Sequence, residues 1–99
     1  MKSNATRYVI CYDVSNGKRR ARLADCLDAY GDRVQESVFE AVLNRPLIDG
    51  LVRDALDIID PEADRVTVYA ICAACERRRV DLGLAANEPP PGTEDVFIV

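Results

Sequence analysis

An unbroken run of apolar and aromatic side chains lies near the start of the chain, from Tyr8 to Tyr12, and it ends at Asp13. β-branched and aromatic residues favour strands, and a run without a polar gap is typical of a strand covered on both faces. Asp is disfavoured in strands, and residues 14–17 have the composition of a turn. The pattern therefore predicts a central strand that places the Asp13 carboxylate at the rim of a sheet.

Apolar residues at helical spacing follow this turn. Ser15 or Asn16 can cap a helix that begins near Gly17. Gly31 is expected to end this helix in the left-handed conformation. The apolar face of the helix, at positions i, i+3, i+4 and i+7, consists of Leu23, Cys26, Leu27 and Tyr30.

Residues 33–43 predict a second strand with an imperfect pattern. Apolar residues occur at both parities, and a bulge or kink near Glu36 and Ser37 would change the register and explain this. Apolar residues on both faces also suit a strand that packs on helices on one side and on a partner subunit on the other.

The middle of the chain predicts a second helix and a third strand. Asn44 can cap the helix, Pro46 fits its first turn, and the Asp-Pro pair at 60–61 ends it. Alternating residues predict a strand over 65–72, and a weakly helical stretch follows at 73–84.

The chain closes with a proline-rich stretch at 87–92 and an apolar tail, Val96 to Val99. Proline lacks a ladder donor, whereas a terminal apolar run needs a strand edge to pair with. The element order resembles an α/β ferredoxin-like βαββαβ sandwich with an extra C-terminal strand. We expect one domain over 1–84, and we expect 85–99 to carry the last strand to the partner subunit of a homodimer.

The composition excludes several kinds of site. The 99 residues include no histidine, which rules out a Ser–His–Asp or Cys–His site within one chain and any His-ligated zinc. The formal net charge is −4, so binding to nucleic acid must rest on local clusters of cations. No apolar run approaches the roughly 20 residues that cross a bilayer, and no signal-peptide core is present. We therefore expect a cytoplasmic protein with reduced thiols and no membrane contact.

A cluster of cations occupies the first turn of the first helix. These charges oppose the helix dipole, at a cost of about 0.3–1 kcal/mol each where exposed. An anion bound there would offset the cost, since helix N-termini present N–H groups. The alternative is a basic face exposed to solvent. The candidate anion-binding cations are Lys18, Arg19, Arg20 and Arg22.

Cys72 and Cys75 are separated by two alanines, and three interpretations stay open. They could form half a zinc site, although zinc needs four ligands and the chain offers no second pair or histidine. They could form a redox pair, provided that the motif opens a helix after a strand. They could also be packing cysteines.

Asp13 is the candidate catalytic and metal-binding residue. Magnesium often sits on one or two carboxylates and keeps its waters. A twofold axis near the end of the first strand would bring two Asp13 side chains together, and this pair could hold one Mg²⁺ that activates water against a phosphodiester. The alternative is that Asp13 only begins the turn.

Several stretches resemble the signature of the CRISPR-associated Cas2 family of endoribonucleases and endonucleases. They are Tyr-Asp-Val-Ser at 12–15, Lys-Arg-Arg at 18–20 and Tyr-Gly-Asp-Arg-Val-Gln-Glu-Ser-Val-Phe-Glu at 30–40. The stretch at 64–69, the Cys72 and Cys75 pair, Gly83 and the tail at 95–99 fit the same family. The resemblance spans almost the whole chain.

The resemblance implies a ferredoxin-like homodimer that exchanges its terminal strands and acts in the acquisition of CRISPR spacers, a step of antiviral defence. In such a system the dimer bridges two dimers of the Cas1 integrase along duplex DNA. Some members of the family are described as magnesium-dependent endonucleases on RNA or double-stranded DNA, with Mg²⁺ shared by Asp13 of both subunits. The positions implied in the site or its surroundings are Tyr12, Arg20, Arg22, Arg33, Ser37 and Phe39.

Two functions of different classes remain open. One is a DNA-binding and integrase-binding adaptor, to which Lys18, Arg19, Arg20, Arg22 and Arg33 contribute cations. The other is a metal-dependent phosphodiesterase centred on Asp13. We favour the adaptor, because arginines are plentiful and clustered whereas catalytic groups are few.

Overall fold

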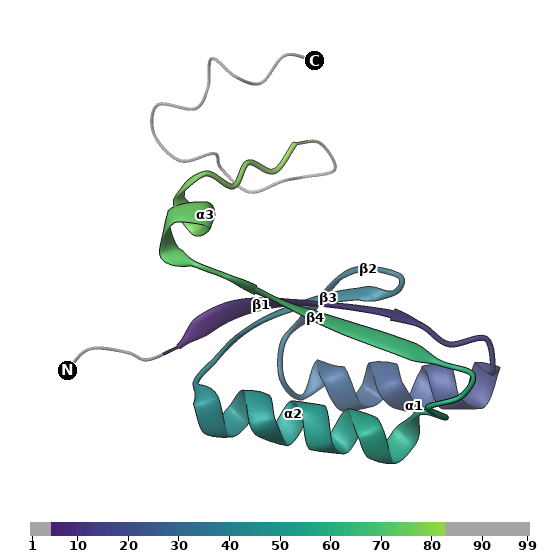
Figure 1. Cartoon of the computed structure of the whole chain (residues 1–99). Helices are drawn as coiled ribbons and strands as arrows, with labels where there is room; N and C mark the ends of the chain where they lie inside the picture. The colour runs from purple at the N-terminus through teal and green to yellow at the C-terminus, as the bar shows by residue number, and fades with distance from the viewer. Residues whose placement is uncertain (1–4, 83–99) are drawn as a thin grey trace.

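A four-stranded antiparallel sheet with two helices on one face forms the body of the molecule (Figure 1). The structure is a computed structural model, and it describes residues 5–82. Its elements are β1 (Thr6–Asp13), α1 (Gly17–Asp28), β2 (Asp32–Gln35), β3 (Val38–Leu43), α2 (Arg45–Ile58), β4 (Arg65–Ile71) and α3 (Ala73–Arg77).

β1 lies at the centre of the sheet, as its continuous apolar run predicts. The strand order is β2-β3-β1-β4, and β1 pairs antiparallel with both β3 and β4. α1 and α2 cover the lower face in Figure 1. This is the ferredoxin-like βαββαβ arrangement, so the predicted fold class is confirmed. The predicted linker and extra C-terminal strand at 85–99 lie outside the described residues.

The predicted single strand over 33–43 is wrong, because the chain reverses direction inside it. Glu36 and Ser37 form the turn of a hairpin between β2 and β3, and Gln35 pairs with Val38. A register shift does occur, but it lies between Arg33 and Gln35 rather than at the turn. The imperfect alternation arose because β2 is wholly exposed whereas β3 buries alternate residues.

Both predicted helix caps are present, but the predicted role of Gly31 is wrong. The Asn16 side chain accepts a hydrogen bond from the N–H of Arg19 at 2.9 Å, and Asn44 caps α2 in the same way. α1 ends at Asp28 with Ala29 as a C-cap in right-handed geometry, and the φ of Gly31 is not in the left-handed region. A Cβ at Gly31 would lie 2.1 Å from the carbonyl oxygen of Glu40, so this glycine is needed for close packing against β3.

The segment after β4 departs slightly from its prediction. β4 ends at Ile71 rather than at residue 72, because Cys72 caps α3. Within the described residues the weakly helical stretch is limited to Ala73–Arg77.

The core lies between the sheet and the two helices. The largest fully buried side chains are Phe39, Ile10, Leu23, Leu27 and Leu51.

Neither α1 nor α2 covers the opposite face of the sheet. Residues directly opposite in an antiparallel ladder share a face, so Val9, Tyr69 and Glu40 lie there together. We call this surface the open face; it also contains Arg7, Cys11, Asp13, Val38, Val42, Arg65, Thr67 and Ile71. Val42 of β3 and Tyr69 of the edge strand β4 are 53% and 57% exposed, so this face presents large apolar side chains to its surroundings.

Candidate functional site

Asp13 is the last residue of β1 and is exposed. Strand alternation directs its carboxylate to the open face, where Arg65 is its register partner on β4. The Asp13 side chain makes no hydrogen bond or ion pair with any residue between 5 and 82. The predicted strand-end carboxylate therefore exists, and within the described chain it is unpaired.

A polar pocket of about 450 Å³ opens at this end of β1, and we call it the Asp13 pocket. Both the end of β1 and the tip of the β2–β3 hairpin contribute to its wall. Its lining residues are Tyr12, Asp13, Val14, Ser15, Arg20, Glu36 and Ser37.

Tyr12 and Arg33 fix the hairpin tip against β1. The Tyr12 hydroxyl donates to the carbonyl oxygen of Glu36 at 3.0 Å, and the Arg33 guanidinium donates to the same oxygen at 2.8 Å. Arg33 also lies over the Phe39 ring, 5.7 Å from the ring centroid, which is a cation–π contact. The backbone N–H of Tyr12 donates to the carbonyl oxygen of Ser37 at 3.1 Å. These contacts hold one wall of the pocket in place.

Arg20 holds the opposite wall. Its Nη1 donates to the carbonyl oxygens of Val14 at 2.9 Å and Ser15 at 3.3 Å, so α1 is tied to the turn that follows β1. The residue remains exposed and lines the pocket beside Asp13. A cation anchored in this way can face a phosphate without first losing much side-chain freedom.

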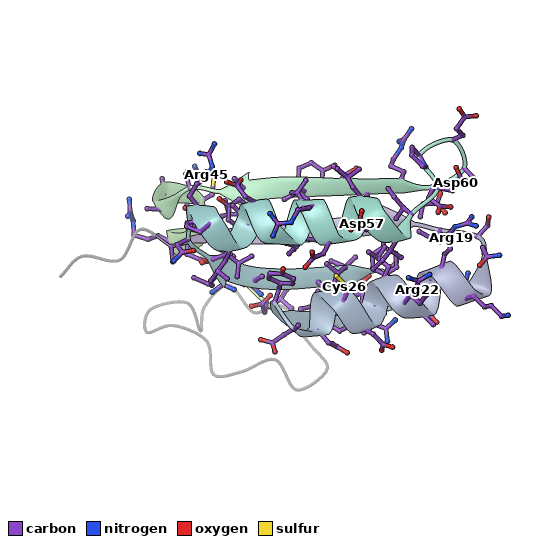
Figure 2. The ribbon with its side chains drawn as sticks, turned by 90° about the horizontal axis from the view of Figure 1, so that it is seen from below. Arg19, Arg22, Cys26, Arg45, Asp57 and Asp60 are labelled. Atoms are coloured by element: carbon purple, nitrogen blue, oxygen red, sulfur yellow. The ribbon has the colours of Figure 1, made fainter. Side chains whose placement is uncertain are left out.

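Arg19 points to a different partner. Its Nε and Nη2 donate to the two carboxylate oxygens of Asp64 at 2.7 and 3.1 Å, and the Asp64 side chain is 0% exposed. Asp64 also accepts the N–H of Asp60. The guanidinium of Arg19 lowers the pKa of the Asp64 carboxyl, and Asp64 raises the pKa of Arg19 in return. Figure 2 shows Arg19 and Asp60 at the same end of the molecule. The ion pair between Arg19 and Asp64 ties α1 to the loop before β4 at this end.

The structure thus divides the predicted site residues into groups. Tyr12, Asp13, Arg20 and Ser37 meet in one pocket, with Arg33 and the buried Phe39 behind it.

The other predicted cations lie outside the pocket. Lys18 and Arg22 are exposed on α1 and have no side-chain partner in the described chain, whereas Arg19 is bound to Asp64. Figure 2 shows Arg22 on the helical side of the molecule.

Sequence reasoning missed Glu36, a second carboxylate residue in the wall of the pocket. A hairpin turn at Glu36 and Ser37 would have revealed it. β3 pairs with β1 so that Val38 lies opposite Cys11, and the preceding turn must therefore lie beside Tyr12 and Asp13. Arg65, opposite Asp13, was also missed, because the register of β4 cannot be read from the sequence.

The donors in the Asp13 pocket fit a hard cation. Asp13 and Glu36 offer carboxylates and Ser15 and Ser37 offer hydroxyls, and oxygen donors are the ligands that Mg²⁺ prefers. No group of three His, Cys, Asp or Glu residues gathers anywhere in the described chain. A magnesium ion bound here would therefore keep several of its waters.

These features define a class of protein: a small ferredoxin-like α/β protein whose first strand ends in an unpaired carboxylate beside an arginine-lined pocket. The family model for CRISPR associated protein Cas2 matches residues 6–79, about three quarters of the chain. The chain belongs to the Cas2 family, and the resemblance seen in its motifs is confirmed.

Relatives and solved structures agree with this family. A CRISPR-associated endoribonuclease Cas2 of Rhodospirillum rubrum is 47% identical over 89% of this chain and 71% of its own length. A CRISPR-associated endonuclease Cas2 of Thermus thermophilus is 38% identical over 70% of this chain and 77% of its own. The crystal structure of Streptococcus pyogenes Cas2 matches with a TM-score of 0.68 at 29% identity, covering 78% of this chain and 99% of that one.

A further structural match comes from a larger assembly. A chain of a partial Cas6-RT-Cas1–Cas2 complex matches with a TM-score of 0.68 at 31% identity, over 77% of this chain and 83% of that one. Within residues 5–82, no helix has the length and apolar character needed to span a membrane.

Proposed function

We propose that this protein is a dimeric, nucleic-acid-binding adaptor of CRISPR spacer acquisition that joins dimers of the Cas1 integrase. The observation that carries the proposal is membership of the Cas2 family together with the likeness to a chain from a Cas1–Cas2 assembly. The finer assignments below, to dimer, nucleic acid and metal, rest on the chain's own residues.

The open face supports a dimer. Val42 and Tyr69 present large apolar side chains on a surface that neither α1 nor α2 covers. Burying apolar area contributes roughly 25 cal/mol per Å², so a second copy stacked on this face would gain stability. Asp13 lies at one end of the same face, so a twofold axis near that end would bring two copies of it together.

The exposed cations support nucleic-acid binding. Lys18, Arg20, Arg22 and Arg33 are exposed, whereas Arg19 is engaged by Asp64. Contacts to phosphates position a duplex without specifying its sequence, which suits an adaptor that accepts varied spacers. The formal net charge of −4 means that such binding depends on where these cations lie.

A nuclease activity is the second candidate, favoured by the unpaired Asp13 carboxylate in a polar pocket. Mg²⁺, when bound, would lower the pKa of a water molecule and polarise a phosphoryl oxygen. Asp13 of both subunits would hold the ion, with Glu36 as a further oxygen ligand from each chain. Arg20 would neutralise charge that develops on the phosphate, while Tyr12 and Arg33 keep the hairpin tip in position.

One experiment separates these functions. The Asp13→Asn variant and the wild type are each mixed with Cas1 from the same host and a duplex substrate. We expect the variant to form the Cas1 complex and support integration at close to the wild-type level, because an amide of the same shape preserves the fold. Absence of a complex between the wild type and Cas1 at micromolar concentrations would contradict the adaptor.

The same variant tests the nuclease candidate. Cleavage of RNA and of duplex DNA is measured with magnesium and with EDTA, and we expect any magnesium-dependent cleavage to disappear in Asp13→Asn. Cleavage at an unchanged rate would remove Asp13 from the reaction. Loss of the dimer in this variant, measured by light scattering, would instead assign Asp13 a structural role.

A further inference from the structure

Two exposed cysteines lie at the start of α3, one at its N-cap and one in its first turn, away from the Asp13 pocket. Cys72 and Cys75 are both exposed and free, whereas Cys11 and Cys26 are partly buried in β1 and α1. Cys72 caps α3, which follows a strand directly. The structure therefore meets the condition that the sequence set for a redox pair, namely a Cys-x-x-Cys motif that opens a helix after a strand.

The two side chains are already close to each other. The backbone N–H of Cys75 donates to Sγ of Cys72, with an N···S distance of 3.5 Å. Because the amide nitrogen of Cys75 is only two bonds from its own Cβ, this hydrogen bond brings Cys72 Sγ beside the Cys75 side chain. Cys72 has extended backbone geometry, with φ −72° and ψ 168°, which directs its sulfur over the first turn of α3. The two thiols also contact each other, which places them within reach of a disulfide.

The surroundings make the two thiols unequal. Hydrogen bonding from the Cys75 N–H, from the Cys75 thiol and from the Ala74 N–H lowers the pKa of the Cys72 thiol. The same thiol–thiol contact raises the pKa of Cys75. A thiolate is the attacking species in disulfide exchange, so Cys72 is the nucleophile and Cys75 the resolving thiol.

We propose that Cys72 and Cys75 form a reversible dithiol–disulfide pair that exchanges with low-molecular-weight disulfides such as oxidised glutathione. The Cys72 thiolate attacks one sulfur of glutathione disulfide, which forms a mixed disulfide and releases one glutathione thiolate. Cys75 then loses its proton and its sulfur attacks Cys72 Sγ, which releases the second glutathione. The pair gives up two electrons and two protons, and one glutathione disulfide becomes two glutathione thiols.

The disulfide would restrict the motion of α3 and of the residues that follow it, up to Arg79. Glu76 forms an ion pair with Arg7 of β1, and Arg79 forms one with Glu40 of β3 at 2.7 Å. Both partners lie on the open face, so α3 and the residues after it are fastened to the surface that we assign to the dimer. A bond between Cys72 and Cys75 restricts the turn that carries Glu76, and we expect slower amide exchange over residues 73–79 in the oxidised protein.

The test equilibrates the full chain with reduced and oxidised glutathione at a series of ratios, quenches with acid and measures intact mass and peptide maps. We expect one species that has lost two hydrogen atoms, with the bond mapped to Cys72 and Cys75 and with Cys11 and Cys26 reduced. The Cys75→Ser variant should accumulate glutathione on Cys72. The Cys72→Ser variant should react at Cys75 about tenfold more slowly than Cys75→Ser reacts at Cys72, because Cys75 lacks the backbone N–H donors that lower the pKa of Cys72. Cys26→Ser is the matched control and should behave as the wild type.

Several outcomes would overturn the proposal. One is the absence of the Cys72–Cys75 disulfide at every glutathione ratio in protein whose circular dichroism is native. Another is equal modification of all four cysteines, which would mean that neither exposure nor the thiol–thiol contact distinguishes Cys72 and Cys75 from Cys11 and Cys26. A third is a zinc ion shared by the cysteines of two subunits, detected by native mass spectrometry, which would make the pair a metal site. None of these outcomes measures binding to Cas1 or to nucleic acid, so the redox proposal can fail while the adaptor stands.

Discussion

The alternation of side chains along β1 gives neighbouring residues opposite tasks. Tyr12 faces the helices and is 5% exposed, while Asp13 faces the open side of the sheet. The Tyr12 hydroxyl reaches the backbone of Glu36, so the residue that packs the core also positions the pocket wall next to the carboxylate. A single residue step along the strand therefore separates a structural role from a chemical one.

The Glu36→Gln substitution tests whether the pocket uses a second carboxylate. Removing one charge from the wall should weaken Mn²⁺ or Mg²⁺ binding about tenfold while thermal stability stays unchanged, because the Glu36 side chain has no partner in the described chain. Isothermal titration calorimetry gives the affinity. Glu62→Gln, on an exposed turn that does not line the pocket, is the control. Equal metal affinities of the two variants would show that the Glu36 carboxylate does not contribute to metal binding in the pocket.

Charge reversal at Lys18 and Arg22 tests the exposed cations of α1. The double variant Lys18→Glu, Arg22→Glu should bind duplex DNA more weakly, with a log affinity that falls less steeply with log salt, because fewer counterions are released. Arg45→Glu is the control, since Arg45 lies at the opposite end of the helical side (Figure 2). A salt slope equal to that of the control would exclude α1 from the nucleic-acid surface.

At the scale of elements, strands and helix caps could be predicted from the sequence wherever they depend on residues close together in the chain. The central strand and both asparagine caps were predicted, because side-chain period and capping chemistry act within a few residues. The hairpin was missed because Glu36 and Ser37 lack the Asn-Gly or Gly signal of tight turns.

Contacts between distant segments escaped prediction for a different reason. The Arg19–Asp64 pair joins residues 45 positions apart, and only the folded sheet brings them together. The close packing of Gly31 on β3 likewise depends on the fold. The Asp13 carboxylate could be predicted because a strand end is a local feature, whereas its neighbours in the pocket could not.

The Arg19–Asp64 pair predicts a pH dependence of stability. The pKa of Asp64 is lowered in the folded state, so its contribution is present above the unfolded value of about 3.9 and is lost as pH falls through the lower folded pKa. Urea unfolding between neutral and acid pH, at fixed protein concentration, should show a shallower acid loss in Asp64→Asn than in the wild type. Asp25→Asn, on an exposed position of α1, should retain the wild-type slope. Parallel slopes in all three proteins would contradict a linkage through Asp64.

Gly31→Ala tests the close approach of the α1–β2 connection to β3. The added Cβ would lie 2.6 Å from Cβ of Ala41 and closer still to the Glu40 carbonyl oxygen, so backbone must move. We expect a loss of about 1–3 kcal/mol in the free energy of unfolding, measured by urea denaturation. Gly17→Ala is the control, because its nearest atom is the Arg20 guanidinium at 3.7 Å. Equal free energies of unfolding in the two variants would show that β3 moves to accommodate the added Cβ without loss of stability.

At the scale of the whole molecule, the two faces of the sheet differ in kind. α1 and α2 cover the helical face (Figure 1), whereas the open face carries the exposed Val42 and Tyr69 and ion pairs to Glu76 of α3 and to Arg79 after it. The tail from Val96 to Val99 lies outside the described residues, and its pairing with a partner stays a prediction. Deletion of these four residues should weaken the dimer if the strand is exchanged.

The Tyr69→Lys substitution tests the open face directly. In a face-to-face dimer it would place two cations in an apolar interface, so we expect the dimer dissociation constant to rise at least tenfold, measured by sedimentation across a concentration series. Leu47→Lys, at a 47% exposed position on α2, is the control and should leave the dimer intact. A Tyr69→Lys protein that stays dimeric at the same concentrations would show that the open face is not the dimer interface.

The hairpin tip is held through the carbonyl oxygen of Glu36, which accepts from both Tyr12 and Arg33. Every amino acid supplies the same backbone carbonyl, so these two hydrogen bonds do not depend on which side chain stands at position 36. Position 36 is therefore suited to protein engineering. A fluorophore, a chelating side chain or a randomised library can be introduced there, beside Asp13, while the hairpin keeps its backbone hydrogen bonds.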